Sequence, residues 1–177
     1  MRLVTFGVAN SLDNFIGRPD GAVDWLVWDN EVAEVTNKFW KTIDTVVMGR
    51  KTYEVAARSG SGTYPGVKNY VFSRTLKQHP KKVEVISQDA VDFIRRLKQE
   101  AGKGICVMGG GELAHSLLQA NLLDQIGLNI QPVMLGTGIP LFLEMGRQVD
   151  LELFEHKKLK SGSVFVFYRV KKTENDA

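Results

Sequence analysis

The sequence predicts an α/β fold in which a largely parallel β-sheet is covered by helices on both faces. Two observations support this prediction. Short apolar runs typical of strands alternate along the chain with stretches whose apolar residues recur at helical spacing. The last two strand patterns, over residues 151–154 and 164–170, follow each other without an intervening helix. We therefore expect an antiparallel pair at one edge of the sheet.

The remaining strand predictions rest on short runs of β-branched and other apolar residues between polar or glycine-rich stretches. The run Ile105, Cys106, Val107 and Met108 has no polar member, whereas Ile126, Leu128 and Ile130 alternate with other residues. By these criteria we predict strands over residues 2–9, 45–48, 69–72, 83–86, 105–108 and 126–130.

The helix predictions rest on spacing and capping residues. In residues 30–42, Val32, Val35 and Phe39 share one face, and Asp29 or Asn30 is well placed as the N-cap. Ser87 is placed to cap a helix over residues 88–101, which Gly102 ends. Two further helices begin within residues 49–52 and directly after residues 109–111.

Two stretches read as loops. Residues 10–24 are rich in Asp, Asn, Gly and Pro, but Phe15 and Ile16 within them are apolar, so this loop is expected to fold back over the core or a ligand. Gly136, Gly138 and Pro140 mark a second, irregular loop.

Composition limits the class of protein. The 177 residues are 44% hydrophobic and suit a single domain, which we place at residues 1–170, followed by a frayed tail at 171–177. A net charge of +3 from dispersed residues does not indicate a nucleic-acid partner, and no apolar run approaches membrane-spanning length. The single cysteine allows no intrachain disulfide, and the three histidines lack metal-ligand spacing. We expect a cytoplasmic protein without a metal site.

Three strand ends carry residues suited to anions. In open α/β sheets, ligands bind beyond the carboxyl ends of the strands, where backbone N–H groups and helix N-termini can hold phosphates. Solvated basic loops and capping hydroxyls would explain each turn alone, but the three together favour a dinucleotide. The three turns contain Arg50, Lys51 and Thr52; Ser73, Arg74 and Thr75; and Gly109, Gly110 and Gly111.

Residues 109–114 also satisfy the pattern G-x-G-x-x-A of a Rossmann fold. We reject that interpretation, because the pattern should open the first βαβ unit and be followed by an acidic residue at the end of the next strand. Here it follows several predicted strands, and the next strand ends in Gln131 and Pro132.

The motifs MGRKTYE, VFSRT, VMGGGELA and PVMLGTGIPLF, in this order and spacing, resemble the dihydrofolate-reductase-like superfamily. They are most similar to the C-terminal reductase domain of the bacterial riboflavin-pathway protein and its stand-alone relatives. The likeness runs from VANSLDNFIG to the C-terminal hairpin. It implies a three-layer α/β/α fold with a mostly parallel central sheet and an antiparallel C-terminal hairpin, NADPH as the cofactor, a small-molecule substrate and a homodimer.

The resemblance also implies which residues bind the cofactor. Gly109 and Gly110 match a pair that a cis peptide joins in the family, and Gly110 to Leu113 present backbone donors to the pyrophosphate. Ser73 and Arg74, with Thr75 beside them, match the loop that recognises the adenosine 2′-phosphate, and Arg50 suits the same group. The full set is Ala9, Ile16, Gly17, Gly49, Arg50, Lys51, Thr52, Ser73, Arg74, Thr75, Gly109, Gly110, Gly111, Glu112 and Leu113.

The position of the substrate acid is open. Dihydrofolate reductases place a carboxylate on the first helix; counting forward from Ile16 and Gly17 puts it at Asp29, and counting back from Met48 puts it at Ala33. We name Asp29 and Glu31 as candidate catalytic residues, with Asp29 as a plain N-cap the alternative.

On the rest of the substrate side, this chain resembles the riboflavin-pathway reductases at some positions and differs from them at others. Asn10, Ser11 and Asp13 resemble a substrate-contacting loop, although Asp13 is equally suited to cap that loop, and Asp24 and Trp25 are further candidates. The riboflavin-pathway reductases carry a glutamate directly before the glycine pair, where this chain has Met108.

From these features we predict an NADPH-dependent reductase that resembles 5-amino-6-(5-phosphoribosylamino)uracil reductase. We expect it to transfer hydride to a small heterocyclic or carbonyl substrate. The alternatives are a non-catalytic NADP(H)-binding module that has lost the substrate acid, dihydrofolate reductase activity, and a structural domain without cofactor.

Overall fold

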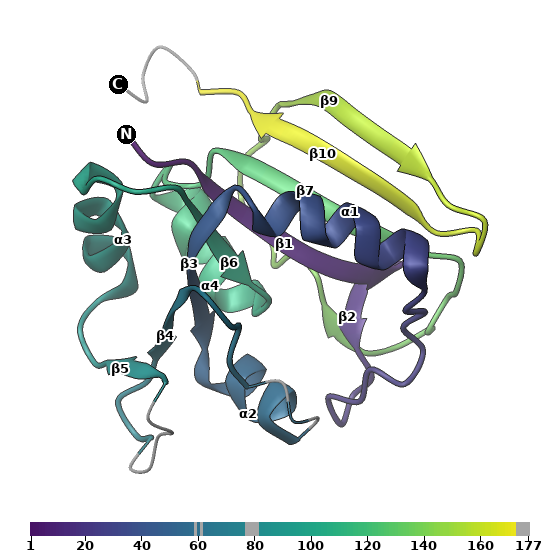
Figure 1. Cartoon of the computed structure of the whole chain (residues 1–177), viewed down its shortest axis with the longest axis horizontal. Helices are drawn as coiled ribbons and strands as arrows, with labels where there is room; N and C mark the ends of the chain where they lie inside the picture. The colour runs from purple at the N-terminus through teal and green to yellow at the C-terminus, as the bar shows by residue number, and fades with distance from the viewer. Residues whose placement is uncertain (59, 61, 77–81, 173–177) are drawn as a thin grey trace.

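The computed structural model of the chain describes residues 1–58, 60, 62–76 and 82–172. Within them, an eight-stranded sheet has the order β5-β4-β3-β6-β1-β7-β10-β9 (Figure 1). Six of its strands are mutually parallel and two are antiparallel at one edge, as predicted. The parallel strands are β1 (Val4–Ser11), β3 (Ile43–Gly49), β4 (Lys68–Phe72), β5 (Glu84–Ile86), β6 (Gly104–Met108) and β7 (Gln125–Gln131).

The antiparallel edge consists of β10 (Val164–Val170), which pairs with β7, and β9 (Leu151–Lys158) outside it. Phe167 lies opposite Glu155 and Tyr168 opposite Leu153, so Phe154 forms a bulge in the edge strand. Bulges and charged residues at an edge oppose sheet-to-sheet aggregation.

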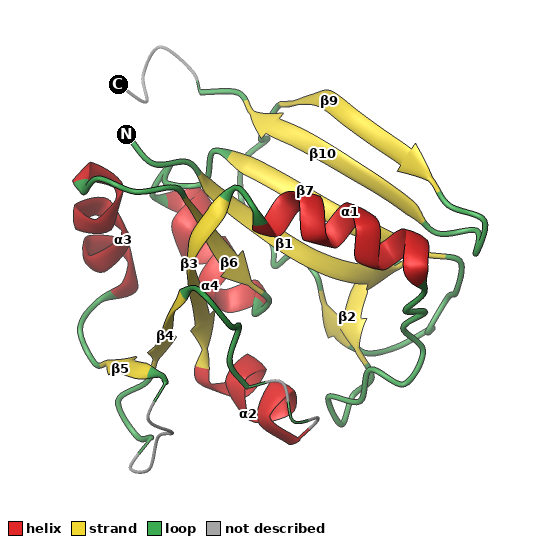
Figure 2. Cartoon of the chain, in the orientation of Figure 1, coloured by secondary structure: helices red, strands yellow, loops and turns green. Residues whose placement is uncertain are grey.

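Helices cover both faces and complete three layers, which confirms the predicted fold class (Figure 2). One face packs against α3 (Ala90–Gln99) and α4 (Gly111–Gln119), through residues such as Ile94 and Leu117. The other face packs against α1 (Asn30–Trp40) and α2 (Arg50–Arg58), through residues such as Val32 and Tyr53. Ile105, Cys106 and Val107 in β6 are fully buried, because a central parallel strand is covered on both faces.

Several sequence predictions about local structure were wrong. The helix expected from residue 88, with Ser87 as its cap, begins at Ala90 with Asp89 as the N-cap, because the Asp89 carboxylate accepts hydrogen bonds from the N–H groups of Val91 and Asp92. It ends at Gln99 rather than residue 101.

The two expected loops also contain a second, two-stranded sheet. β2 (Phe15–Gly17) and β8 (Ile139–Pro140) pair antiparallel, so the loop after β1 folds onto the stretch expected to be irregular. Ile16 packs against the main core, as its apolar character in a polar loop suggested.

Lys171 and Lys172, the first two residues of the predicted tail, contact the rest of the chain. The N–H of Lys171 donates to the carbonyl oxygen of Asp150, and the ammonium of Lys172 pairs with Asp124 at 2.9 Å. The rest of that tail, residues 173–177, lies outside the described residues.

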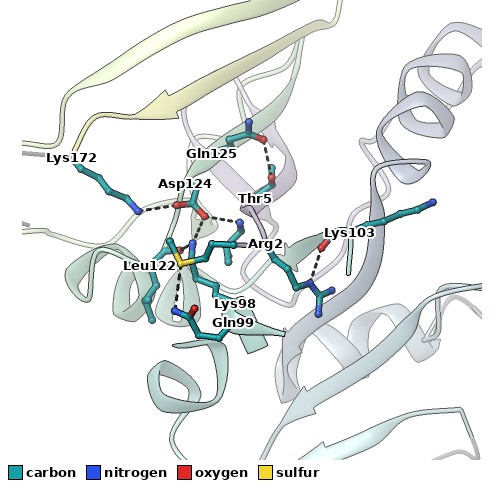
Figure 3. A network of polar contacts seen from close by, with 11 residues as sticks. Arg2, Thr5, Lys98, Gln99, Lys103, Leu122, Asp124, Gln125 and Lys172 are labelled. Carbon is teal, nitrogen blue, oxygen red and sulfur yellow. Dashed lines mark hydrogen bonds and ion pairs between the residues drawn. The ribbon is translucent and has the colours of Figure 1, made fainter. Parts of the chain in front are cut away.

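A polar network ties the chain together beside the amino ends of the strands (Figure 3). The carboxylate of Asp124 accepts hydrogen bonds from the N–H of Val4 and from the ammonium groups of Lys98 and Lys172. Arg2 pairs with Asp44 and donates to the carbonyl oxygen of Lys103 at 2.7 Å. These contacts lie at the end of the sheet away from the predicted ligand site.

Candidate functional site

The candidate site lies beyond the carboxyl ends of the parallel strands. Because these strands run in the same direction, their last residues lie along one edge of the sheet. All three predicted anion turns follow directly from such ends, at Gly49 of β3, Phe72 of β4 and Met108 of β6.

The glycine turn joins β6 to α4. Gly109 and Gly110 have φ values of +59° and +82°, in the region that glycine adopts without strain. The peptide bond between them is trans, so the cis bond that the resemblance implied is wrong for this chain. The two positive φ values make the turn into the helix. Gly110 is the N-cap of α4 and provides no side-chain hydrogen bond, which leaves the first N–H groups of the helix without a side-chain cap.

The turn after β3 contacts the glycine turn. A methyl group at Gly109 would lie 3.1 Å from Cγ2 of Thr52, which places the Thr52 side chain against the glycines. Lys51 and Glu112, at the starts of α2 and α4, form an ion pair of 3.6 Å. Both side chains are about four-fifths exposed, so this pair contributes little to stability, but it confirms that the two helix starts are neighbours.

The turn after β3 also reaches the turn after β4. Arg50 lines one pocket of about 380 Å³ together with residues of the second turn and of the start of α3. The pocket is lined by Arg50, Phe72, Ser73, Arg74, Thr75, Ile86, Ser87, Gln88, Asp89 and Ala90. The hydroxyl oxygen of Ser73 accepts hydrogen bonds from the N–H groups of Thr75 and Leu76, and the guanidinium of Arg50 pairs with Glu54 at 2.7 Å. The lining thus combines two arginines and several hydroxyls with one acid, Asp89, whose carboxylate caps α3.

The loop after β1 closes against the glycine turn through β8. The N–H of Leu141 donates to the carbonyl oxygen of Asn14 at 2.8 Å, and a methyl group at Gly111 would lie 3.0 Å from the carbonyl oxygen of Pro140. Gly17 pairs with Ile139. The structure therefore brings Ile16 and Gly17 to the same edge as the glycine turn, as it does Ala9 in β1.

Asp13 fixes the substrate-side loop. Its carboxylate accepts hydrogen bonds from the Ser11 hydroxyl at 2.6 Å and from the N–H groups of Leu135 and Gly136 at 3.0 and 2.7 Å. The hydrogen bond from Ser11, followed by those from the two backbone N–H groups, outweighs the effect of burial and lowers the pKa of Asp13. Asp13 thus joins the first loop to residues 132–138, which is the capping role weighed as the alternative.

The candidate acids are also engaged in structural contacts. Asp29 is the N-cap of α1 and accepts from the N–H of Val32 at 2.8 Å. Glu31 accepts from the N–H of Lys160 at 2.8 Å, in the turn between β9 and β10. Asp24 pairs with Arg18 at 2.7 Å, and both side chains are exposed. The hydrogen bond from Arg18 lowers the pKa of Asp24.

The sequence interpretation missed two buried amides on β7, Asn129 and Gln131. Asn129 Oδ1 and Gln131 Nε2 are buried without a hydrogen-bond partner, as are Asn10 Oδ1 and Trp25 Nε1. Asn10 and Gln131 lie at the carboxyl ends of the neighbouring strands β1 and β7. Trp25 belongs to the segment of residues 23–28, whose Val27 N–H donates to Gln131 Oε1. The signal that could have identified the two amides is the presence of polar residues at alternate positions of a predicted strand.

The described residues contain no group of three or more His, Cys, Asp and Glu side chains that could hold a metal ion. In the same part of the chain, no helix is both long and apolar enough to cross a membrane. Burial raises the pKa of the Cys106 thiol to about 12, which fits a small buried apolar residue rather than a reactive thiol.

Comparison with known sequences and structures places these features in a family. The model of the RibD C-terminal domain family matches residues 2–165. YwjB of Bacillus subtilis (strain 168) is 36% identical over 149 residues, which cover 82% of this chain and 86% of YwjB. YyaP of the same organism is 29% identical over 179 residues, covering 94% of each.

Solved structures share the fold. A putative riboflavin biosynthesis protein from Shewanella sp. PV-4 superposes with a TM-score of 0.81 at 26% identity, covering 97% of this chain and 100% of that one. RibD of Acinetobacter baumannii gives a TM-score of 0.75 at 17% identity, and a Corynebacterium diphtheriae pyrimidine reductase-like protein gives 0.74 at 15%. Each match covers 97% of this chain; it covers 59% of the A. baumannii chain and 93% of the C. diphtheriae chain.

Proposed function

Because the chain belongs to the RibD C-terminal domain family, we propose that it is an NADPH-dependent reductase that transfers hydride to a small heterocyclic or carbonyl substrate. The observation that carries the proposal is the convergence of the three anion turns. Arg50 and Thr52 both belong to the turn after β3. Arg50 lines the pocket of the turn after β4, and Thr52 contacts the glycines of the turn after β6. A dinucleotide with three phosphates needs donors spread over such an edge.

The residues present fit the phosphates of NADPH. Arg74 and Arg50 supply positive charge to the pocket, and the Ser73 hydroxyl, which accepts its two backbone bonds, can donate its own proton. We assign the adenosine 2′-phosphate to this pocket. Asp89 lies in the same lining, and its charge is directed to the N–H groups that begin α3.

The glycine turn fits the pyrophosphate. The start of α4 offers N–H groups without a side-chain cap, and the absence of Cβ atoms at Gly109 and Gly110 leaves room for the Thr52 side chain beside the turn. Glu112 stands in this first helical turn, where its negative charge would oppose a phosphate, and Lys51 offsets it.

NADPH, when bound, supplies a hydride to the carbon of a C=N or C=O group and leaves as NADP⁺, while the neighbouring nitrogen or oxygen takes a proton. The chain's task is to position the two reactants and to admit that proton. The carboxylates of Asp29 and Glu31 accept hydrogen bonds from backbone N–H groups. We therefore propose solvent as the proton source.

Two substitutions of Asp29 test this assignment. Asp29→Ala should lower the free energy of unfolding by about 1 kcal/mol, because the N-cap of α1 is lost, whereas Asp29→Asn should preserve it within a few tenths of a kcal/mol. With solvent as the proton source, Asp29→Asn should also keep its rate of NADPH oxidation within about twofold. A fall of about 100-fold in a stable Asp29→Asn variant would instead make Asp29 the proton donor.

A non-catalytic NADP(H)-binding module is the second candidate. Met108 stands where the riboflavin-pathway reductases carry a glutamate, and it packs against the α1 and α2 face of the core. The two candidate acids accept hydrogen bonds from backbone N–H groups. These observations favour a chain that has the cofactor-binding turns but lacks acidic residues for catalysis.

The decisive experiment measures NADPH oxidation with three classes of substrate: the riboflavin-pathway pyrimidine, dihydrofolate and a panel of small carbonyl compounds. Turnover with the pyrimidine or a carbonyl compound would support the proposal, and turnover with dihydrofolate would assign dihydrofolate reductase activity instead. NADPH binding without turnover of any of them would favour the binding module.

A further inference from the structure

Two carboxylates of the chain hold the two cations at the start of α2. The guanidinium of Arg50 pairs with Glu54, one turn further along α2, at 2.7 Å. The ammonium of Lys51 pairs with Glu112, in the first turn of α4, at 3.6 Å. Arg50 lines the pocket assigned to the 2′-phosphate, and Lys51 lies beside the helix start assigned to the pyrophosphate. A phosphate that binds there meets cations that already have partners.

The folding of α2 does not account for these cations. A helix N-terminus carries a partial positive charge, so acidic residues stabilise the first turn and basic residues destabilise it. The first turn of α2 has no acid and begins with Arg50 and Lys51. The first turn of α4 follows the usual rule, because it contains Glu112. The cations at α2 therefore suit an anionic ligand, whereas the acid at α4 suits the helix itself.

Glu112 opposes a bound pyrophosphate in two ways. Its negative charge lies in the same helical turn as the N–H groups assigned to the pyrophosphate, so the two anions repel each other. It also pairs with Lys51, and a phosphate that attracts the ammonium must draw it away from this carboxylate. The side chains of Lys51 and Glu112 are 79% and 81% exposed, so the pair is weak and can exchange partners readily.

Glu54 opposes the 2′-phosphate alone. Its Oε1 accepts from Nη1 of Arg50, so a phosphate that forms two hydrogen bonds with this guanidinium has to compete with the carboxylate. NADPH carries the 2′-phosphate and NADH does not, whereas both carry the pyrophosphate. Glu54 therefore acts on the binding of NADPH only, and Glu112 acts on the binding of both cofactors.

We propose that Glu54 and Glu112 are internal counter-ions, which compete with the phosphates of the dinucleotide for Arg50 and Lys51. They hold the affinity for the cofactor below the value that the three turns alone would give. A lower affinity appears mainly as faster dissociation, so the two carboxylates speed the release of NADP⁺ after hydride transfer. This inference rests on the proposed function, because it takes the starts of α2 and α4 as phosphate sites, and it adds the control of cofactor affinity.

Glutamine substitutions remove each negative charge at nearly unchanged size. In fluorescence titrations at low salt, Glu112→Gln should bind NADPH and NADH each about three- to fivefold more tightly than the wild type. Glu54→Gln should bind NADPH more tightly by a similar factor and leave NADH binding unchanged. The dissociation rate of NADP⁺, measured by stopped flow, should fall in both variants. Their Tm without cofactor should not exceed that of the wild type, so the tighter binding does not come from a more stable fold.

The matched control is Glu34→Gln. Glu34 of α1 pairs with Lys157 of β9 at 3.6 Å, the same distance as between Lys51 and Glu112, and neither residue belongs to the three turns. Glu34→Gln should leave the affinities for NADPH and NADH unchanged. The gains in the other two variants should shrink at high salt, which screens exposed charges.

A second substitution tests whether Lys51 exchanges partners. If it leaves Glu112 for the phosphate, Lys51→Met should weaken NADPH binding more in the Glu112→Gln background than in the wild type, because the lysine then gives up no carboxylate on binding. Equal weakening in the two backgrounds would mean that Lys51 stays with Glu112 in the complex, which contradicts the competition.

Further results would overturn the inference. They are unchanged or weaker NADPH binding by both Gln variants, a gain from Glu34→Gln as large as that from Glu112→Gln, and equal gains for NADH and NADPH in Glu54→Gln. Each of these can occur while the wild type binds NADPH saturably, in which case the cofactor assignment stands. Absence of saturable binding in the wild type and in both Gln variants would instead refute the proposed function, and the inference with it.

Discussion

Replacing Arg74 with alanine is expected to weaken NADPH binding about tenfold and to leave NADH binding almost unchanged. Arg74 is exposed at the pocket that we assign to the 2′-phosphate, the group by which the two cofactors differ. A hydrogen bond between charged partners contributes about 1.5–3 kcal/mol, and solvent exposure favours the lower end of that range. The guanidinium of Arg50 is paired with Glu54, so Arg50→Ala alone should weaken NADPH binding by less than about tenfold, and the double variant should bind NADPH more weakly than Arg74→Ala by that same smaller factor.

The control for charge is Arg95→Ala. Arg95 is an exposed arginine on α3 that pairs with Asp92 and does not line the pocket. Fluorescence titrations at two salt concentrations should show weaker NADPH binding for Arg74→Ala but not for Arg95→Ala, and the difference should be smaller at high salt. Equal weakening of NADH and NADPH, or the same effect from Arg95→Ala, would place the 2′-phosphate elsewhere.

Replacing Asp124 with alanine is expected to lower the free energy of unfolding by about 3–5 kcal/mol. The side chains of Asp124 and Lys98 are only 12% and 4% exposed, and Lys172 also pairs with this carboxylate (Figure 3). Removing the carboxylate leaves the Lys98 ammonium buried without its counter-charge. Urea denaturation measures the loss. Lys98→Met in the same chain should restore part of it, because the buried charge is then gone.

The same site predicts a dependence of stability on pH. Burial would raise the pKa of Asp124, but the hydrogen bonds from Lys98, the Val4 N–H and Lys172 outweigh it, so the pKa lies below its usual 3.8. A carboxyl with a lowered pKa stabilises the folded state above the unfolded pKa, and this contribution is lost as the pH falls through the folded value. The decrease in the free energy of unfolding on acidification should therefore be smaller in the Asp124→Ala, Lys98→Met double variant than in the wild type. An equal loss in both proteins would contradict the assignment.

Much of the fold followed from local patterns. The run of Ile105, Cys106 and Val107 identified a strand that proves to be fully buried, and the three glycines after it identified the turn into α4. Such features are local, because a continuous apolar run and a glycine at positive φ depend on few other residues.

Other features depended on distant partners and could not be predicted locally. The pairing of β2 with β8 joins segments more than a hundred residues apart, and each is too short to show a strand pattern. From the sequence we named Ser87 alone as the cap, but Ser and Asp both cap helices well, and the choice between Ser87 and Asp89 depends on the path of the chain from β5.

The substrate side was the least predictable part of the site. Ile126, Leu128 and Ile130 suggested alternation, which is typical of a strand with one solvated face. In the sheet, β7 lies between β1 and β10 and is covered on both faces, so the residues at the alternate positions, Asn129 and Gln131, are buried. Their role depends on what covers the strand.

Equilibrium titration of the purified chain with NADPH and with NADH tests the central claim most directly. With the three turns acting as one dinucleotide site, NADPH should bind saturably, at one equivalent per chain, and at least about tenfold more tightly than NADH. Absence of saturable binding for both cofactors would contradict the dinucleotide site itself, and equal affinity for the two would contradict the 2′-phosphate pocket formed by Arg50, Ser73 and Arg74.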